Sequence, residues 1–120
     1  MANFKSFEDV ENIAEQKAKQ LSESTGKKVF TYMGKVQDNE DGTSDWALGY
    51  LKEPARPIKM EALDRLRKDG ELKAGDFLIA ACLIREESDP RLLSDDSLYI
   101  GLAYASPKVI DIKADQSKKN

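Results

Sequence analysis

The chain has 120 residues, of which 40% are hydrophobic and 34% are charged, and its formal net charge is −3. These values predict one folded domain with a buried core and exclude wholesale disorder. Nucleic acid is not an expected partner, because phosphate binding needs clustered lysines and arginines that an acidic chain lacks. We expect no membrane association and a cytoplasmic location, since no apolar signal core or membrane-length apolar stretch is present.

Residue types that carry common catalytic chemistry are scarce in this chain. Histidine is absent, which removes the most common general base and every zinc site that uses histidine. The single cysteine, Cys82, lies inside the apolar run FLIAACLI. We expect it to be a small buried side chain and not a reactive thiol.

The first predicted element is a helix of about 16 residues that begins after Ser6. Asp9 follows Ser6 at the spacing of a capping box, with aspartate in place of the usual glutamate. Gly26 is the predicted stop. One apolar stripe with spacings of mostly three and four comprises Phe7, Val10, Ile13, Ala14, Ala18 and Leu21.

A β-hairpin is predicted next, from two segments rich in β-branched and aromatic residues, 27–36 and 45–51. The polar stretch QDNEDGTSD joins them as a loop longer than a two-residue turn. Because an isolated hairpin is marginal in water, we expect one of its faces to pack on helices. Alternation places Val29, Thr31 and Met33 on one face and Phe30, Tyr32 and Gly34 on the other.

Two prolines mark the change from strand to helix after the hairpin. Pro54 and Pro57 end the second strand and start a helix, because proline suits a first helical turn and not a strand interior. The helix is predicted to close at Gly70. Its apolar stripe consists of Ile58, Ala62, Leu63 and Leu66.

The apolar run 75–84 fits a buried strand or a buried helix by its periodicity alone. Its two central alanines, Ala80 and Ala81, favour a helix. An all-round apolar helix must be covered on most sides. Gly75 counts against one uninterrupted helix, so Asp76 is the alternative start.

The remaining segments predict a loop, a helix and a tail. Residues 85–94 are expected to connect to a helix that begins at Asp95 and Asp96, because acidic residues suit a helix start. Ser106-Pro107 ends this helix, and KVIDI (108–112) is a helical turn or an edge strand. The predicted class is α+β: an N-terminal helix, a β-hairpin and a compact cluster of about three helices in a single domain, 1–112. Residues 113–120 form a flexible polar tail.

No cofactor, metal or catalytic site is expected. The stretch DNEDGTSD (38–45) has oxygen-bearing side chains around a glycine, but it lacks the EF-hand register and the closing glutamate. The adjacent carboxylates Glu86-Glu87 and Asp95-Asp96 are neighbours in sequence, which does not make them converge on a substrate. No P-loop, dinucleotide fingerprint or nucleophile elbow is present. The chain is therefore not predicted to be an enzyme.

A protein partner is the expectation, and the candidate contact residues are mainly aromatic. Tyrosine and tryptophan bury a large area at interfaces while one polar atom stays wet. The alternative is that these aromatics cap the core. Arg56, held between two prolines, joins Tyr50 as a candidate anchor. The full candidate set is Trp46, Tyr50, Arg56, Tyr99 and Tyr104.

Three segments carry a family resemblance. They are WALGYLKEPARP (46–57), KAGDFLIAACLI (73–84) and SDDSLYIGLAYA (94–105). Together they resemble small tail assembly chaperones of tailed bacteriophages, particularly those encoded in Bacteroidetes genomes. The shared features are a strand ending in Tyr-Leu-basic-x-Pro-x-Arg, a helix with a cysteine near its end, and an Asp-Asp-x-Leu helix start.

The resemblance implies a non-enzymatic assembly factor made in the cytoplasm of an infected bacterial host. Such proteins bind the long helical tape measure protein, keep it from aggregating and help recruit tail tube subunits. The expected site is a groove between the hairpin and the helices that takes an amphipathic helix. A homo-oligomer is also expected. The alternative is a small structural protein of a phage particle, or a bacterial interaction module with a permanent partner.

Overall fold

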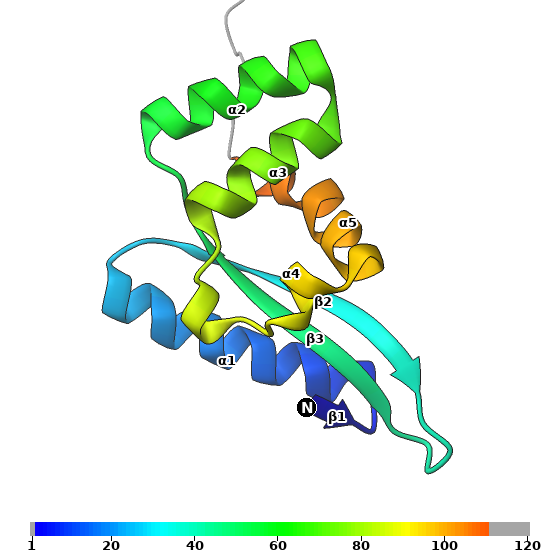
Figure 1. Cartoon of the computed structure of the whole chain (residues 1–120). Coiled ribbons are helices and arrows are strands. Elements are labelled where there is room, and N and C mark those ends of the chain that lie inside the picture. The colour runs from blue at the N-terminus through cyan, green and yellow to red at the C-terminus, as the bar shows by residue number, and fades with distance from the viewer. Residues whose placement is uncertain (1, 111–120) are drawn as a thin grey trace, which may run out of the picture.

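A computed structural model describes residues 2–110 and has the predicted α+β fold (Figure 1). The predicted tail 113–120 lies outside the described residues, as do Met1 and the last two residues of the predicted domain. The elements in chain order are β1 (Ala2–Phe4), α1 (Phe7–Thr25), β2 (Val29–Asp38), β3 (Ser44–Lys52), α2 (Arg56–Asp69), α3 (Glu71–Cys82), the 3₁₀ turn η1 (Arg85–Glu87), α4 (Arg91–Ser94), α5 (Asp96–Ala105) and the 3₁₀ turn η2 (Ser106–Val109).

The helix α1 begins after Ser6 and ends before Gly26, as predicted. This span holds 19 residues, where a helix of about 16 was expected. The Ser6 Oγ accepts a hydrogen bond of 3.2 Å from the Asp9 amide. Gly26 ends the helix at φ 71°, a left-handed conformation that favours glycine. Four of the six stripe residues are buried, namely Val10, Ala14, Ala18 and Leu21. Phe7 and Ile13 stay about half exposed.

The sheet is antiparallel with strand order β1-β3-β2, so β3 is central. Its hairpin is the predicted one, with Val29 opposite Lys52 and a bulge between Lys35 and Gln37. The strand β1, which pairs Phe4 with Ser44, was not predicted from the sequence. A strand of three residues is too short to show an alternating pattern, and here it forms by pairing with the hairpin.

Both faces of the hairpin are covered, not one as expected (Figure 1). On one face, Val29 and Tyr50 pack with Leu21 of α1. On the other face, Phe30 and Leu51 pack in a cluster formed mainly by α3 and α5. The alternation of side chains along each strand supplies both contacts. The hairpin is therefore the middle layer of the molecule.

The apolar run 75–84 forms most of α3, which starts four residues earlier and passes through Gly75 without a break. The alternative start at Asp76 is wrong. A Cβ added at Gly75 would lie 1.7 Å from the main-chain oxygen of Ala103, so α3 and α5 cross too closely there for a side chain. The helix was expected to be covered on most sides, but Ala80 and Ala81 are exposed.

The predicted boundaries of α2 and α5 hold. The helix α2 has Pro57 in its first turn and ends at Gly70, where φ is 94°. The Asp95 side chain caps α5 by accepting a hydrogen bond from the Leu98 amide. The segment 85–94 contains η1 and α4 in place of a plain loop. Within KVIDI, Lys108 and Val109 lie in η2, and the residues after Ile110 are outside the described part.

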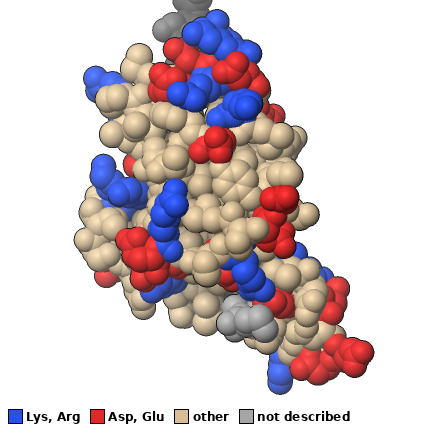
Figure 2. Space-filling model, viewed as in Figure 1, with Lys and Arg blue, Asp and Glu red and all other residues tan. Residues whose placement is uncertain are grey.

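The charged side chains are unevenly distributed on the surface. Figure 2 shows charged side chains of both signs gathered over the α2 end of the molecule and at the hairpin tip, with others scattered over the surface between. Within residues 2–110, no helix combines the length and the apolar character needed to cross a membrane.

Candidate protein-binding groove

A groove of about 640 Å³ lies where α1, β3 and the segment 86–91 meet. We call it the α1 groove. Its floor is mainly apolar and its rim carries charges of both signs. The lining residues are Ile13, Lys17, Trp46, Leu48, Tyr50, Glu86, Glu87, Ser88, Asp89, Pro90 and Arg91.

The floor comes from one face of β3. Trp46, Leu48 and Tyr50 alternate along the strand and therefore share the face toward α1. The Phe7 ring lies 5.7 Å from the Trp46 ring, centroid to centroid, and extends the apolar surface. Ile13 is 48% exposed although it belongs to the apolar stripe of α1. The helix thus presents an uncovered apolar side chain beside the floor.

The wall of the groove is bonded to the outer edge of β3. The Ile84 amide donates to the Tyr50 carbonyl at 2.8 Å, and the Asp89 amide donates to the Leu48 carbonyl at 2.9 Å. The Tyr50 amide donates to the Ser88 Oγ at 3.1 Å. These bonds satisfy main-chain groups of β3 that point away from β2. They also fix the wall at one distance from the floor.

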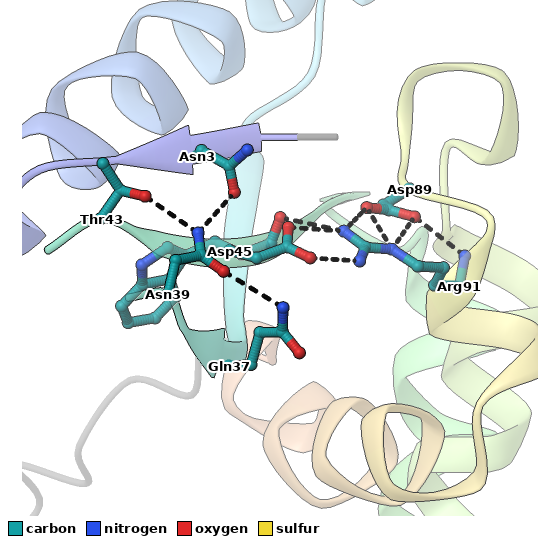
Figure 3. A network of polar contacts seen from close by, with 8 residues as sticks. Asn3, Gln37, Asn39, Thr43, Asp45, Asp89 and Arg91 are labelled. Atoms are coloured by element: carbon teal, nitrogen blue, oxygen red, sulfur yellow. Dashed lines mark hydrogen bonds and ion pairs between the residues drawn. The ribbon is translucent and has the colours of Figure 1, made fainter. Parts of the chain in front are cut away.

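Arg91 ties the wall to the sheet (Figure 3). Its guanidinium donates to both oxygens of Asp45, at 2.7 and 3.1 Å, and to the Asp89 carboxylate at 2.8 Å. Asp45 is only 3% exposed. A buried carboxylate is costly without a partner, and a two-pronged arginine contact is the geometry that best supplies one.

The electrostatics of this cluster keep all three groups charged. Hydrogen bonds from Arg91 lower the pKa of Asp45 despite its burial. Burial opposes ionisation of Asp89, and the hydrogen bonds from Arg91 outweigh it, so the Asp89 pKa is also lowered. The same contacts, first with Asp45 and then with Asp89, raise the pKa of Arg91. The cluster is thus a stable ionic link between α4 and β3.

A second polar group orders the hairpin loop next to β1 (Figure 3). The Asn39 side chain donates to the Asn3 and Thr43 side chains, at 3.1 and 2.9 Å. Asp41 accepts hydrogen bonds from the amide and the hydroxyl of Thr43. Across residues 2–110, no three side chains of the His, Cys, Asp or Glu type converge in the way that would hold a metal ion.

One ion pair joins the two sides of the α1 groove. Lys17 of α1 lies 2.6 Å from the Glu87 carboxylate of η1, and both side chains are partly exposed. Exposed pairs contribute little to stability, typically about 0–1 kcal/mol. The pair is therefore weak enough to be exchanged for contacts with a charged partner.

Two of the five predicted contact residues meet in this groove. Trp46 and Tyr50 line it, although Tyr50 is only 3% exposed. Arg56 is exposed at the start of α2 and Tyr104 on α5, outside this lining. Tyr99 is partly buried and donates to Asp76; burial first, and this bond second, raise its pKa to about 12.

Two residues that shape the groove were not predicted as site residues from the sequence. Ile13 was assigned to the buried stripe of α1, and Arg91 to a connecting loop. No local signal identifies Arg91, because its partner Asp45 is 46 positions away. Ile13 could have been identified by its position at the edge of a stripe that is wider than the buried face requires.

Comparisons with protein-family models, with curated proteins and with solved structures found no match to this chain.

Proposed function

We propose that the protein is a non-enzymatic, protein-binding assembly factor whose α1 groove takes the apolar face of an amphipathic helix. The observation that carries this proposal is the half-exposed Ile13 beside the Trp46 floor. A helix places apolar side chains at i, i+3, i+4 and i+7 on one face, and a groove of this kind receives that face.

The charges at the rim of the groove also suit an amphipathic helix. Lys17 and Arg91 carry positive charge and Glu86 and Glu87 carry negative charge around the apolar floor. Protein interfaces combine an apolar centre with a polar rim, and aromatic residues are enriched at the centre. The polar flanks of an amphipathic helix would meet this rim while its apolar face covers Ile13 and Trp46.

The wall adds pre-organisation. Because Arg91 holds the segment 86–91 against β3 through Asp45, the groove exists before a partner arrives. A preformed site loses less conformational entropy on binding than one that must assemble around its partner. We therefore expect little change of the main chain on binding.

The resemblance to phage tail assembly chaperones supplies the partner for this proposal. Under it, the protein acts in the cytoplasm of a bacterial host and binds a long helical tail protein of the tape measure type. The groove would cover apolar residues of that protein until its helices pack against one another. No step of this role requires catalysis.

The test is a calorimetric titration with a long helical tail protein of the tape measure type. Ile13→Asp should weaken binding by about 2 kcal/mol, roughly thirtyfold in Kd, because it places a charge at the centre of the interface. Ile100→Asp is the matched control, since Ile100 is 54% exposed on α5, away from the groove. Circular dichroism checks that both variants fold.

The groove would be ruled out as the binding site if both variants lost affinity equally or if both kept it. A helical partner that stays bound in finished particles would favour the alternative of a structural protein. Release of the partner on assembly would favour a chaperone.

A further inference from the structure

We propose that the open edge of β2 binds an extended segment of another protein as an additional strand of the sheet. This interaction surface is separate from the α1 groove and does not rest on the function proposed for it. The strand order β1-β3-β2 leaves β2 at one edge of the sheet. It is a strand of ten residues, Val29–Asp38.

The hydrogen bonds of β3 show which way the β2 main chain points. The amide and carbonyl of Tyr50 bond to Ser88 and Ile84, and the Leu48 carbonyl bonds to Asp89, all on the side away from β2. Thr31 lies opposite Tyr50, and Met33 lies opposite Leu48. When one residue of an antiparallel pair directs its amide and carbonyl away from the partner strand, the residue opposite it does the same. Thr31 and Met33 therefore direct their amides and carbonyls to the open edge.

The two edges of the sheet differ in how far other segments cover them. Along β3, the outer edge is covered by β1 at one end and by the segment 83–89 at the other. Along β2, among the described residues, no strand or loop pairs with Thr31 or Met33. Within β2, the features that discourage strand addition, a lysine and a bulge, lie near the hairpin tip, at Lys35 and the residue after it.

A groove lies on each side of this open edge. The first, about 620 Å³, lies between α1 and the start of β2. The second, about 330 Å³, lies between β2 and η2 with the end of α5. Phe30 and Thr31 line both. Successive side chains of an added strand point to opposite faces of a sheet, so they would enter the two grooves in turn.

The chemistry of the grooves specifies the occupant. The first of these two grooves, between α1 and the start of β2, is bordered by charges of both signs, Glu15, Lys19, Glu23 and Lys28. The groove beside η2 is lined mainly by apolar groups, among them Leu102 and Val109. The complementary partner is an extended segment that alternates charged with apolar residues. Main-chain hydrogen bonds would provide affinity, and the alternation would provide specificity.

The probe is a synthetic peptide of about ten residues, long enough to pair along β2, that alternates valine with lysine and glutamate. The control peptide has the same composition with the valines in one block. Amide hydrogen exchange of the full chain is followed by NMR. We expect the alternating peptide to slow exchange at Thr31 and Met33 by about tenfold or more, because both amides become hydrogen-bonded.

Backbone methylation of the peptide tests the pairing without altering the protein. Two versions are made, N-methylated at one or the other alternate set of amides. Only the set that faces β2 is needed for pairing, so one version should lose binding and the other should keep it.

Two substitutions at one position test the protein side. Thr31→Pro removes the outward amide and no bond of the hairpin, so it should abolish protection of Met33. Thr31→Val keeps the amide and should keep binding. If the proline variant does not fold, the methylated peptides still decide the question.

Four results would overturn the proposal. The first is that the alternating peptide gives no protection, and the second is that both methylated versions bind equally. Slow exchange at Thr31 and Met33 in the dilute protein alone would show that the chain itself occupies the edge. Protection that rises with protein concentration and needs no peptide would identify a second copy as the occupant.

Discussion

Arg91 donates two hydrogen bonds to the carboxylate of Asp45, which is 3% exposed and 46 positions away in the sequence. This contact joins α4 to the central strand and holds the wall of the α1 groove in place (Figure 3). Asp89 shares the same guanidinium. Arg91 therefore reinforces the main-chain bonds that hold the wall against β3.

Arg91→Ala should lower the free energy of unfolding by about 3 kcal/mol, since breaking a buried ion pair leaves the other charge without compensation. Urea denaturation measures the change. Arg85→Ala is the matched control, because Arg85 is exposed on η1 and none of its atoms pairs with a carboxylate in the described residues. Similar unfolding free energies for the two variants would show that the Asp45 link is not structural.

Acid should weaken the protein through the same cluster. The pKa values of Asp45 and Asp89 are lower in the folded state, so their stabilisation is present above the unfolded value, about 4, and is lost as pH falls through the folded values. Arg91→Ala should reduce this loss between neutral pH and pH about 2. Unfolding free energies of both proteins across that range provide the measurement.

Asp38 and Asp41 also have lowered pKa values, owing first to hydrogen bonds from Lys35 and from Thr43 respectively. Both are present in wild type and variant and act equally in each. The difference between the two pH curves therefore isolates the Arg91 cluster. Parallel curves would mean that Arg91 does not set the acid sensitivity.

Gly75→Ala should destabilise the protein by about 3 kcal/mol, although alanine is the better helix former. The added Cβ would fall 1.7 Å from the Ala103 main-chain oxygen, so α3 and α5 must move apart. Thermal unfolding measures the loss. Ala80→Gly, at an exposed position of the same helix, should cost only about 1 kcal/mol. A stabilised Gly75→Ala protein would contradict the close helix crossing.

An aspartate should destabilise the protein to very different extents at two positions of α3 that lie three residues apart. Leu78 is fully buried, so Leu78→Asp should prevent folding by burying an unpaired charge. Ala81 is exposed, and Ala81→Asp should cost about 1 kcal/mol through helix propensity and the helix dipole. Circular dichroism with thermal melts compares them. Loss of folding in Ala81→Asp would show that this face of α3 is buried.

Cys82 should react slowly with a thiol reagent in the native protein and quickly in denaturant. It is 2% exposed, and burial raises the pKa of its thiol, so both access and thiolate are limited. A matched control is Ala81→Cys in a Cys82→Ala background, which moves the thiol to an exposed position and should react quickly. Native Cys82 reacting as fast as this control would argue against its place in the core.

Local signals determined much of the fold from the sequence. Ser6, Gly26 and Gly70 predicted helix boundaries, because capping and left-handed backbone depend on a few neighbouring residues. The prolines around Arg56 marked the change from strand to helix for the same reason. The alternation in 27–36 and 45–51 predicted the hairpin and its two faces. These features need no information from distant parts of the chain.

The tertiary structure alone decided the features that join distant residues. Residues 77–84 are apolar throughout, yet packing against α5 determined which face is buried and left Ala81 exposed. The crossing with Ala103 explains why a glycine stands inside α3 at position 75. The candidate groove arises in the same way: Trp46 was a candidate from its residue type, but Ile13 and Arg91 joined it only through folding. Pairing over 46 positions, as between Asp45 and Arg91, leaves no periodic pattern in a single sequence.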